Sequence, residues 1–201
     1  MEIVREHDEI KAPVDVGTME PAMTGRGLRL SGAILCLAMM TIAIPALAAD
    51  LTVTMQKLTQ DGTGADIGTI AIAASPEGAV FKLHLHGLPP GPHGFHVHEN
   101  DNCGPTLMNG VRIPGGAAGS HWDPDFTGRH AGPDGEGHRG DLPRISVGED
   151  GTATQTLTAP HIKDIAALKK HTLIIHAGGD TYSDEPSLGG GGGRIACGVI
   201  Q

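Results

Sequence analysis

Two histidines stand one residue apart in the run Gly94-Phe95-His96-Val97-His98. Alternate side chains of a β-strand point to the same face and lie about 6.5 to 7 Å apart. Both imidazoles can therefore bind one metal ion through bonds of about 2 Å. A lone His-x-His pair on an exposed strand is often merely solvated, so its meaning depends on further ligands. The candidates for those ligands are His121, His130, His138, Asp141 and His176.

Six imidazoles and one carboxylate are more than one ion needs, so their number indicates two metal sites. A closed set of three histidines and an aspartate suits a structural Zn²⁺ ion; here it would be His121, His130, His138 and Asp141. An all-nitrogen set, which suits copper, would consist of His96, His98, His176 and one more imidazole. Two sets of four then share one ligand, and a deprotonated imidazole can bridge two dications. His121, first in the loop after the strand pair, is the natural candidate.

The elements that position these ligands are predicted to be short β-strands. Apolar and polar residues alternate in several runs, and turn residues such as Asp61-Gly62 separate them. The expected strands are 51–55, 69–73, 81–86, 152–157, 172–176 and 194–200. Only residues 164–170 suggest a helix, of one or two turns. This pattern predicts an all-β sandwich or flattened barrel.

Two long segments show almost no strand pattern. They are residues 99–144, which hold most of the candidate ligands, and residues 177–193, which end in five glycines. Structureless loops of that length inside a compact domain need a reason. A metal ion and a disulfide would anchor them in place of a hydrophobic core, so residues 99–144 are predicted to form a metal-binding loop.

Residues 1–48 resemble a secretory signal peptide. Arg26 and Arg29 precede an apolar run over 32–44, and small residues follow it. We expect cleavage after Ala48, which leaves residues 49–201 as the mature domain. Residues 1–22 are long and acidic for a leader, and a translation start at Met23 would explain them. The alternative is an amphipathic or buried N-terminal helix.

Charge and cysteine usage narrow the possible functions. The chain has a formal net charge of −9, and an acidic protein is a poor binder of nucleic acid. The predicted domain retains two cysteines, Cys103 and Cys197. In an exported protein we expect them to form one disulfide, with two buried free thiols as the alternative.

Taken in order, the motifs resemble the bacterial, periplasmic branch of the copper/zinc superoxide dismutases over about residues 50–201. After Gly94–His98, the motifs that carry this resemblance are Gly119-Ser120-His121-Trp122-Asp123-Pro124, His130-Ala131-Gly132-Pro133, Gly137-His138-Arg139-Gly140-Asp141-Leu142-Pro143, His176-Ala177-Gly178-Gly179-Asp180 and Gly193-Arg194-Ile195-Ala196-Cys197-Gly198-Val199-Ile200.

The resemblance implies a Greek-key, immunoglobulin-like sandwich with one Cu²⁺ and one Zn²⁺ per subunit. The implied copper ligands are His96, His98, His121 and His176, and the implied zinc ligands are His121, His130, His138 and Asp141. Cys103 and Cys197 match the family's disulfide, and Arg194 matches the arginine that draws in superoxide beside copper. Asp180 matches the carboxylate that links a copper histidine to a zinc histidine, which fixes ring orientation.

The implied function is a periplasmic superoxide dismutase that makes O₂ and hydrogen peroxide by alternate reduction and reoxidation of copper. His121 would carry one of the protons. The implied protein is a monomer or homodimer with no stable membrane anchor after cleavage. Between Cys103 and Arg112 the only cation is Arg112, where relatives often carry lysines, so electrostatic guidance of the substrate is expected to be weaker.

Two other classes of protein share some of these features. A non-catalytic periplasmic copper/zinc-binding protein would need the ligands but neither Arg194 nor Asp180. A cupin-type metal oxygenase would use a glutamate ligand a few residues after the His-x-His, whereas Glu99 points to the opposite face.

Four further residues have interpretations of their own. His93 is read as hydrogen-bonded to backbone. His84 and His86 are read either as solvated or as an adventitious metal site. Trp122 is read either as local packing or as a dimer contact.

Overall fold

The computed structural model describes residues 51–201, so the predicted leader and its cleavage site lie outside the described residues. Its strands are β1 (Leu51–Thr59), β2 (Gly62–Ser75), β3 (Gly78–Leu85), β4 (Gly91–His93), β5 (Phe95–His98), β6 (Thr106–Met108), β7 (Val111–Ile113), β8 (Ile145–Val147), β9 (Thr156–Ala159), β10 (Thr172–His176) and β11 (Arg194–Val199). Three short 3₁₀ helices are η1 (Gly116–Ala118), η2 (Ile165–Leu168) and η3 (Ser187–Gly190). No helix within residues 51–201 is long and apolar enough to cross a membrane.

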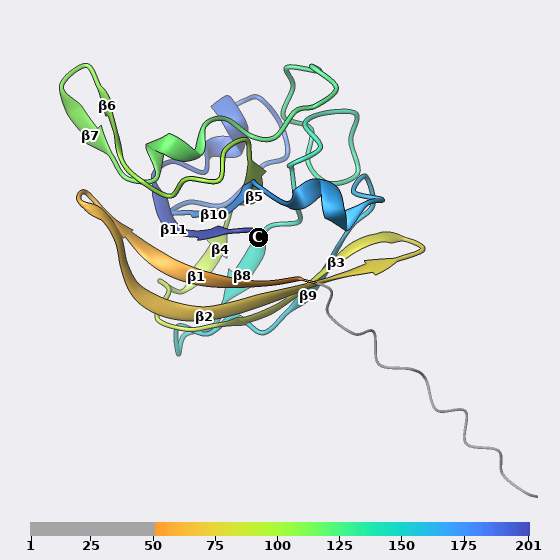
Figure 1. The fold of residues 1–201 in the computed structure, drawn as a ribbon, viewed down its shortest axis with the longest axis horizontal. Coiled ribbons are helices and arrows are strands. Elements are labelled where there is room, and N and C mark those ends of the chain that lie inside the picture. Colours follow the sequence, from red (N-terminus) through yellow and green to blue (C-terminus); the bar gives the residue numbers. More distant parts are fainter. Residues whose placement is uncertain (1–50) are drawn as a thin grey trace, which may run out of the picture. The chain divides into compact units, whose positions relative to one another are not determined.

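Seven strands form one antiparallel sheet in the order β5-β10-β11-β1-β2-β3-β9. The sheet is strongly curled, with β1 and β2 in one wall and β5, β10 and β11 in another (Figure 1). The curl brings Phe81 of β3 against Phe95 of β5, with ring centroids 5.9 Å apart at an angle of 89°. Because these strands stand near opposite ends of the strand order, their contact places the core between the two walls. The prediction of an all-β sandwich or flattened barrel is confirmed.

The core follows from strand alternation. In β3, Phe81, Leu83 and Leu85 are buried while Lys82 and His84 are exposed. Aliphatic side chains from the other strands fill the remaining space, and burial of each contributes about 1.5 to 3 kcal/mol. Other fully buried large side chains, from strands and from the segments between them, include Met55, Ile67, Ile70, Ile72, Leu142, Ile145, Ile162 and Leu168.

Several elements differ from the sequence predictions. The segment expected to be featureless, 99–144, contains the β6–β7 hairpin, which projects away from the sheet (Figure 1), and η1. The strand expected over 152–157 begins only at Thr156, because Ala153 forms a single bridge to Leu85 instead of a continuous ladder. The helix expected over 164–170 is one 3₁₀ turn, which starts where the Asp164 carboxylate accepts a hydrogen bond from the amide of Ala166.

Candidate metal centre

Strand β5 brings together the segments that carry the candidate ligands. On one side it pairs with β10, and the amide of His176 donates to the carbonyl of Gly94 at 2.9 Å. On its other side, β5 contacts the metal-binding loop through two isolated β-bridges, which join His96 to Asp141 and His98 to His121. One short strand therefore brings together all the segments that carry the candidate ligands.

The first group consists of four buried imidazoles: His96, His98, His121 and His176. Their potential ligand atoms lie within 4.8 Å of one another. The ring centroids of His96 and His121 are 4.0 Å apart, and those of His98 and His121 are 5.0 Å apart. Phe95 and Val97 alternate with His96 and His98 and pack into the core, which holds the two histidines on the opposite face.

Each histidine of this group uses one ring nitrogen for a hydrogen bond that fixes its orientation. Nε2 of His96 donates to Asp180 at 2.8 Å, and Nδ1 of His98 donates to the carbonyl of Gly119 at 2.9 Å. Nδ1 of His176 lies 3.2 Å from the carbonyl of Gly192. The remaining nitrogens are buried and have no hydrogen-bond partner; they are Nδ1 of His96 and Nε2 of His98, His121 and His176.

Buried, unpartnered nitrogens of this kind are costly unless something binds them. A copper ion fits because it would accept four imidazole lone pairs, the donor type that suits copper. The other hydrogen bond of each ring fixes the tautomer that leaves the lone pair free, which is the usual arrangement around a metal-bound histidine.

The second group converges on Asp141. One carboxylate oxygen of Asp141, Oδ1, lies 2.9 Å from Nδ1 of His121, 2.9 Å from Nδ1 of His130 and 3.3 Å from Nδ1 of His138. Although it is this close to Asp141, Nδ1 of His130 makes no hydrogen bond. Three nitrogens crowded around one carboxylate oxygen fit a Zn²⁺ ion, for which all four groups are ordinary ligands.

By distance alone the fourth member of this group is His96 and not His138, because the four potential ligand atoms that lie within 4.8 Å of one another belong to Asp141, His121, His130 and His96. Its two nitrogens are nevertheless committed elsewhere. Nε2 is bonded to Asp180, and Nδ1 belongs to the first group. His138, whose Nδ1 lies at Asp141, remains a candidate for the fourth position, and His121 is the ring that faces both groups.

Asp180 joins the two groups directly. Its Oδ2 accepts from Nε2 of His96, and its Oδ1 accepts from Nε2 of His130, both at 2.8 Å. The carboxylate is buried, and it comes from the segment after β10. The structure thus places one carboxylate between a histidine of each group.

Burial sets the charge of the first group. It lowers the pKa of His96 to about 3 and that of His176 to about 4, and it holds the pKa of His98 well below the ordinary value. Burial also lowers the pKa of His121. All four rings are neutral at pH 7, which is the form that binds a metal ion.

The second group, unlike the first, contains charged side chains. Burial alone would lower the pKa of His130, but the carboxylates of Asp141 and Asp180 outweigh it and raise the pKa to about 9. Burial would raise the pKa of Asp141, yet its contacts with His121, His130 and His138 hold that pKa well below its usual range. Without metal, a proton on His130 thus compensates part of the negative charge that Zn²⁺ would neutralise.

Arg194 begins β11 and is half-buried. Its guanidinium donates to the carbonyl oxygens of Gly115 and Gly119. The latter carbonyl also accepts from His98, so the cation stands beside the first group. Burial is the main cause of the lowered pKa values of His98 and His176, and the charge of Arg194 adds to it in the same direction.

The disulfide prediction is confirmed: Cys103 is bonded to Cys197, with their Cα atoms 5.8 Å apart. It joins the start of the metal-binding loop to β11, three residues beyond Arg194. The loop carbonyls that hold Arg194 and the strand that carries it are therefore linked covalently.

Other histidines lie apart from both groups. Each ring nitrogen of His93 faces a backbone carbonyl, of His176 at 2.7 Å and of Pro89 at 2.8 Å. His84 is exposed on β3, and His86 is exposed just after it. Trp122 packs against the core and lies beside His171, with ring centroids 4.9 Å apart, which favours a local packing role.

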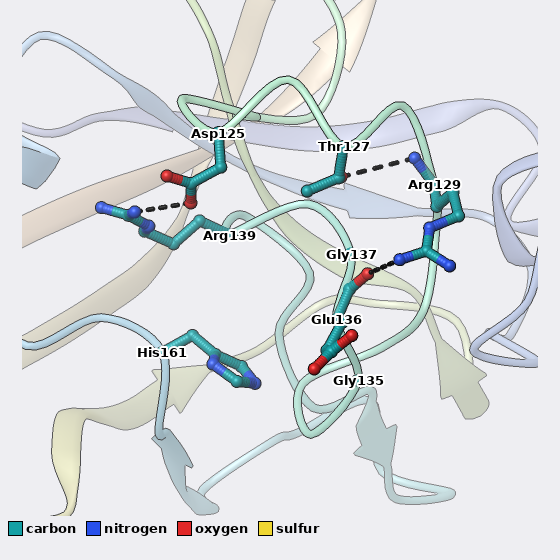
Figure 2. A pocket seen from close by; sticks show the side chains of 8 residues that line it. All are labelled: Asp125, Thr127, Arg129, Gly135, Glu136, Gly137, Arg139 and His161. Atoms are coloured by element: carbon teal, nitrogen blue, oxygen red, sulfur yellow. Dashed lines mark hydrogen bonds and ion pairs between the residues drawn. The ribbon is translucent and has the colours of Figure 1, made fainter.

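A separate cavity of about 370 Å³ lies on the metal-binding loop, and none of the candidate ligands lines it (Figure 2). Two arginines line it, but both are engaged within the loop. Arg139 pairs with Asp125, and Arg129 donates to the carbonyl of Glu136 (Figure 2). The cavity is therefore separate from the two histidine groups.

Comparison with known proteins agrees with this geometry. The family model for copper/zinc superoxide dismutase matches residues 66–200. The Cu-Zn superoxide dismutase of Brucella abortus is 49% identical over 164 residues, which cover 81% of this chain and 95% of that protein. The solved Cu/Zn superoxide dismutase from Brucella abortus superposes with a TM-score of 0.74 at 50% identity, covering 75% of this chain and 98% of that one. A monomeric copper, zinc superoxide dismutase from Salmonella enterica superposes with a TM-score of 0.69 at 48% identity, covering 77% and 100%.

Fold and site together define a two-metal β-sandwich oxidoreductase. The chain belongs to the copper/zinc superoxide dismutases. Copper and zinc are the cofactors of this enzyme family, and the two histidine groups are suited to both ions.

Proposed function

We propose that this enzyme dismutates superoxide with copper held by His96, His98, His121 and His176 and zinc held by His121, His130, His138 and Asp141. The observation that carries this assignment is the set of buried, unpartnered imidazole nitrogens in the first group. The convergence of three histidines on one oxygen of Asp141 supports the second set. The relatives are named as dismutases, which favours catalysis over simple metal binding.

A copper ion held by His96, His98, His121 and His176 would supply the one-electron redox chemistry that converts two superoxide ions and two protons into O₂ and hydrogen peroxide. The protein residues bind the anion and move protons. Arg194 offers the incoming superoxide a cation beside the histidine group, held in place by the carbonyls of Gly115 and Gly119. It gives an acidic protein a local positive target.

His121 is placed to carry a proton. Its Nδ1 lies at Asp141 in the second group, and its Nε2 faces the first group without another partner. Nε2 can therefore take up a proton and pass it to the peroxide, while a second proton comes from solvent. Asp180 keeps His96 and His130 in fixed orientations throughout.

The experiment is metal analysis together with superoxide dismutation on protein beginning at Ala49. We expect about one copper and one zinc per chain, with activity abolished by His96→Ala. Zinc alone, with no activity after copper is supplied, would instead favour the non-catalytic copper/zinc-binding function.

We also propose that the protein acts in the periplasm, after removal of residues 1–48. The relatives are bacterial, the leader pattern supports export, and the Cys103–Cys197 disulfide suits an oxidising compartment. Mass spectrometry of protein from the periplasmic fraction would identify the mature N-terminus, and retention of residues 1–48 would contradict export. Light scattering on the same material would distinguish monomer from homodimer.

A further inference from the structure

The Asp180 carboxylate depends on more than the two histidines it joins. Its Oδ1 also accepts a hydrogen bond from the backbone amide of Tyr182 at 2.8 Å. The backbone carbonyl of Asp180 accepts a hydrogen bond from the guanidinium of Arg144 at 3.3 Å. The carboxylate is therefore oriented by a short turn over residues 180–182, and anything that fixes this turn also fixes His96 and His130.

Tyr182 adopts a conformation that its residue type does not favour. Its φ angle is +59°, in the left-handed region. A bulky residue is rare there, because its Cβ crowds the backbone in that conformation. Glycine would adopt it without strain. The presence of tyrosine at this point therefore calls for contacts that offset the cost.

The side chain of Tyr182 makes those contacts with two other segments. Its hydroxyl accepts a hydrogen bond from the amide of Arg144 at 2.9 Å, just before β8. The guanidinium of Arg144 lies 5.8 Å from the centroid of its ring. Its Cβ and ring also pack on Gly132, where an added Cβ would lie only 2.6 Å from Cβ and Cγ of Tyr182. Gly132 is buried between the ligands His130 and His138.

We propose that Tyr182 is a positioning residue that clamps the metal-binding loop at Gly132 and the Asp180 turn to Arg144, and so holds His130 and His96 in their ligating orientations. Within the described residues, its hydroxyl bonds to the amide of Arg144 and not to any of the proposed metal ligands. Its effect passes through the Asp180 carboxylate on one side and through the loop backbone at Gly132 on the other. The inference rests on the zinc ligand set proposed above.

The test measures binding of Co²⁺ and Zn²⁺ to the purified metal-free protein, with the visible absorption of bound Co²⁺ reporting the coordination geometry. Tyr182→Gly keeps the backbone conformation and removes the clamp, whereas Tyr182→Phe removes only the hydroxyl. Phe126→Gly is the matched control. Phe126 is also an aromatic residue with positive φ, at +55°, in the metal-binding loop, but its side chain is 91% exposed.

We expect Tyr182→Gly to weaken Co²⁺ and Zn²⁺ binding by about tenfold to a hundredfold, the range seen when residues that orient metal ligands are changed. Its Co²⁺ spectrum should change as well. Tyr182→Phe should give a smaller loss in the same direction, and it decides the matter if Tyr182→Gly does not fold. Phe126→Gly should leave both affinity and spectrum unchanged.

Native affinity and spectrum in both Tyr182 variants would overturn the clamp while leaving the ligand set intact. An equal loss in Phe126→Gly would also overturn it, because the effect would then come from the loop backbone and not from the side chain of Tyr182. A native protein that binds no Co²⁺ would overturn the ligand assignment itself, and the clamp with it.

Discussion

His98 and Arg194 share one hydrogen-bond acceptor, the carbonyl oxygen of Gly119. The imidazole Nδ1 approaches it at 2.9 Å, and a guanidinium nitrogen approaches it at 2.6 Å. One backbone atom thus fixes the tautomer of a proposed copper ligand and the position of the cation that would receive the substrate.

Replacing Arg194 should slow dismutation without removing metal. Arg194→Ala removes the local positive charge, and we expect the second-order rate constant to fall by about tenfold or more. Arg194→Lys keeps a cation but lacks the planar fork that reaches two carbonyls at once, so it should be intermediate. Rates measured with metal content will test this, and loss of copper from Arg194→Ala would contradict the assignment.

Changing Asp180 should weaken the zinc site. In Asp180→Asn one oxygen becomes an NH₂ group, which can no longer accept from a histidine, so we expect zinc affinity to fall by about tenfold to a hundredfold. Asp184→Asn is the matched control. Asp184 accepts only from the backbone amide of His130, at 3.1 Å, and an asparagine oxygen can still do so. Competition with a zinc chelator measures both variants, and equal affinities would show that Asp180 does not orient the ligands.

The metal-free protein should lose stability as the pH falls below about 6.5. The unfolded histidines bind protons there, whereas the folded His96 and His176, with pKa values lowered by burial to about 3 and about 4, do not. The unfolded state then holds more protons, so its free energy falls relative to the folded state. Urea unfolding in the presence of a chelator from pH 7 to pH 5 will measure the slope.

The metal-free protein should also lose stability as the pH rises above about 6.5, because of His130. Its pKa is raised to about 9 by Asp141 and Asp180, which outweigh the effect of burial. Its contribution to stability is complete below about 6.5 and is lost as the pH rises toward 9. His130→Gln should remove this alkaline loss in the metal-free protein. A variant that keeps the same alkaline slope would show that another group is responsible.

Removing the disulfide should destabilise the fold. Cys103 and Cys197 are 94 residues apart, and closing a loop of that length contributes about 4 to 5 kcal/mol in the chain-entropy model. The Cys103→Ser, Cys197→Ser double variant should therefore unfold at a much lower urea concentration than the oxidised native protein. Reduced native protein is the control and should resemble the variant. An unchanged midpoint in both would contradict this role.

The general architecture and the ligand types could be predicted from the sequence because they depend on local regularities. Alternation predicts the strands, and His-x-His on a strand places His96 and His98 on one face. Strand limits were less accurate where pairing is irregular, as at Ala153, whose single bridge to Leu85 precedes β9. Short strands such as β4 and β8 carry too few residues to show a period, and they exist because they pair with each other.

The supporting contacts of the site could not be predicted in the same way. Gly119 and Gly192 contribute backbone carbonyls, which any residue carries, so their identity gives no signal of a role. Tyr182 contacts Arg144 across 38 positions of the chain. Only the folded arrangement of distant loops reveals such partners. A tyrosine two residues after Asp180 was visible in the sequence, but nothing in its spacing marked its function.

Strand β5 stands at one end of the sheet, and its outer side is paired only by single bridges from the metal-binding loop. An uncovered edge strand exposes amides and carbonyls that can pair with another chain and start aggregation. Here Trp122 and Gly140 cover part of that edge through hydrogen bonds with Val97. The residues beside the proposed metal ligands thus also act as an edge cap, so we expect a change that detaches them from Val97 to reduce both the solubility and the metal content of this protein.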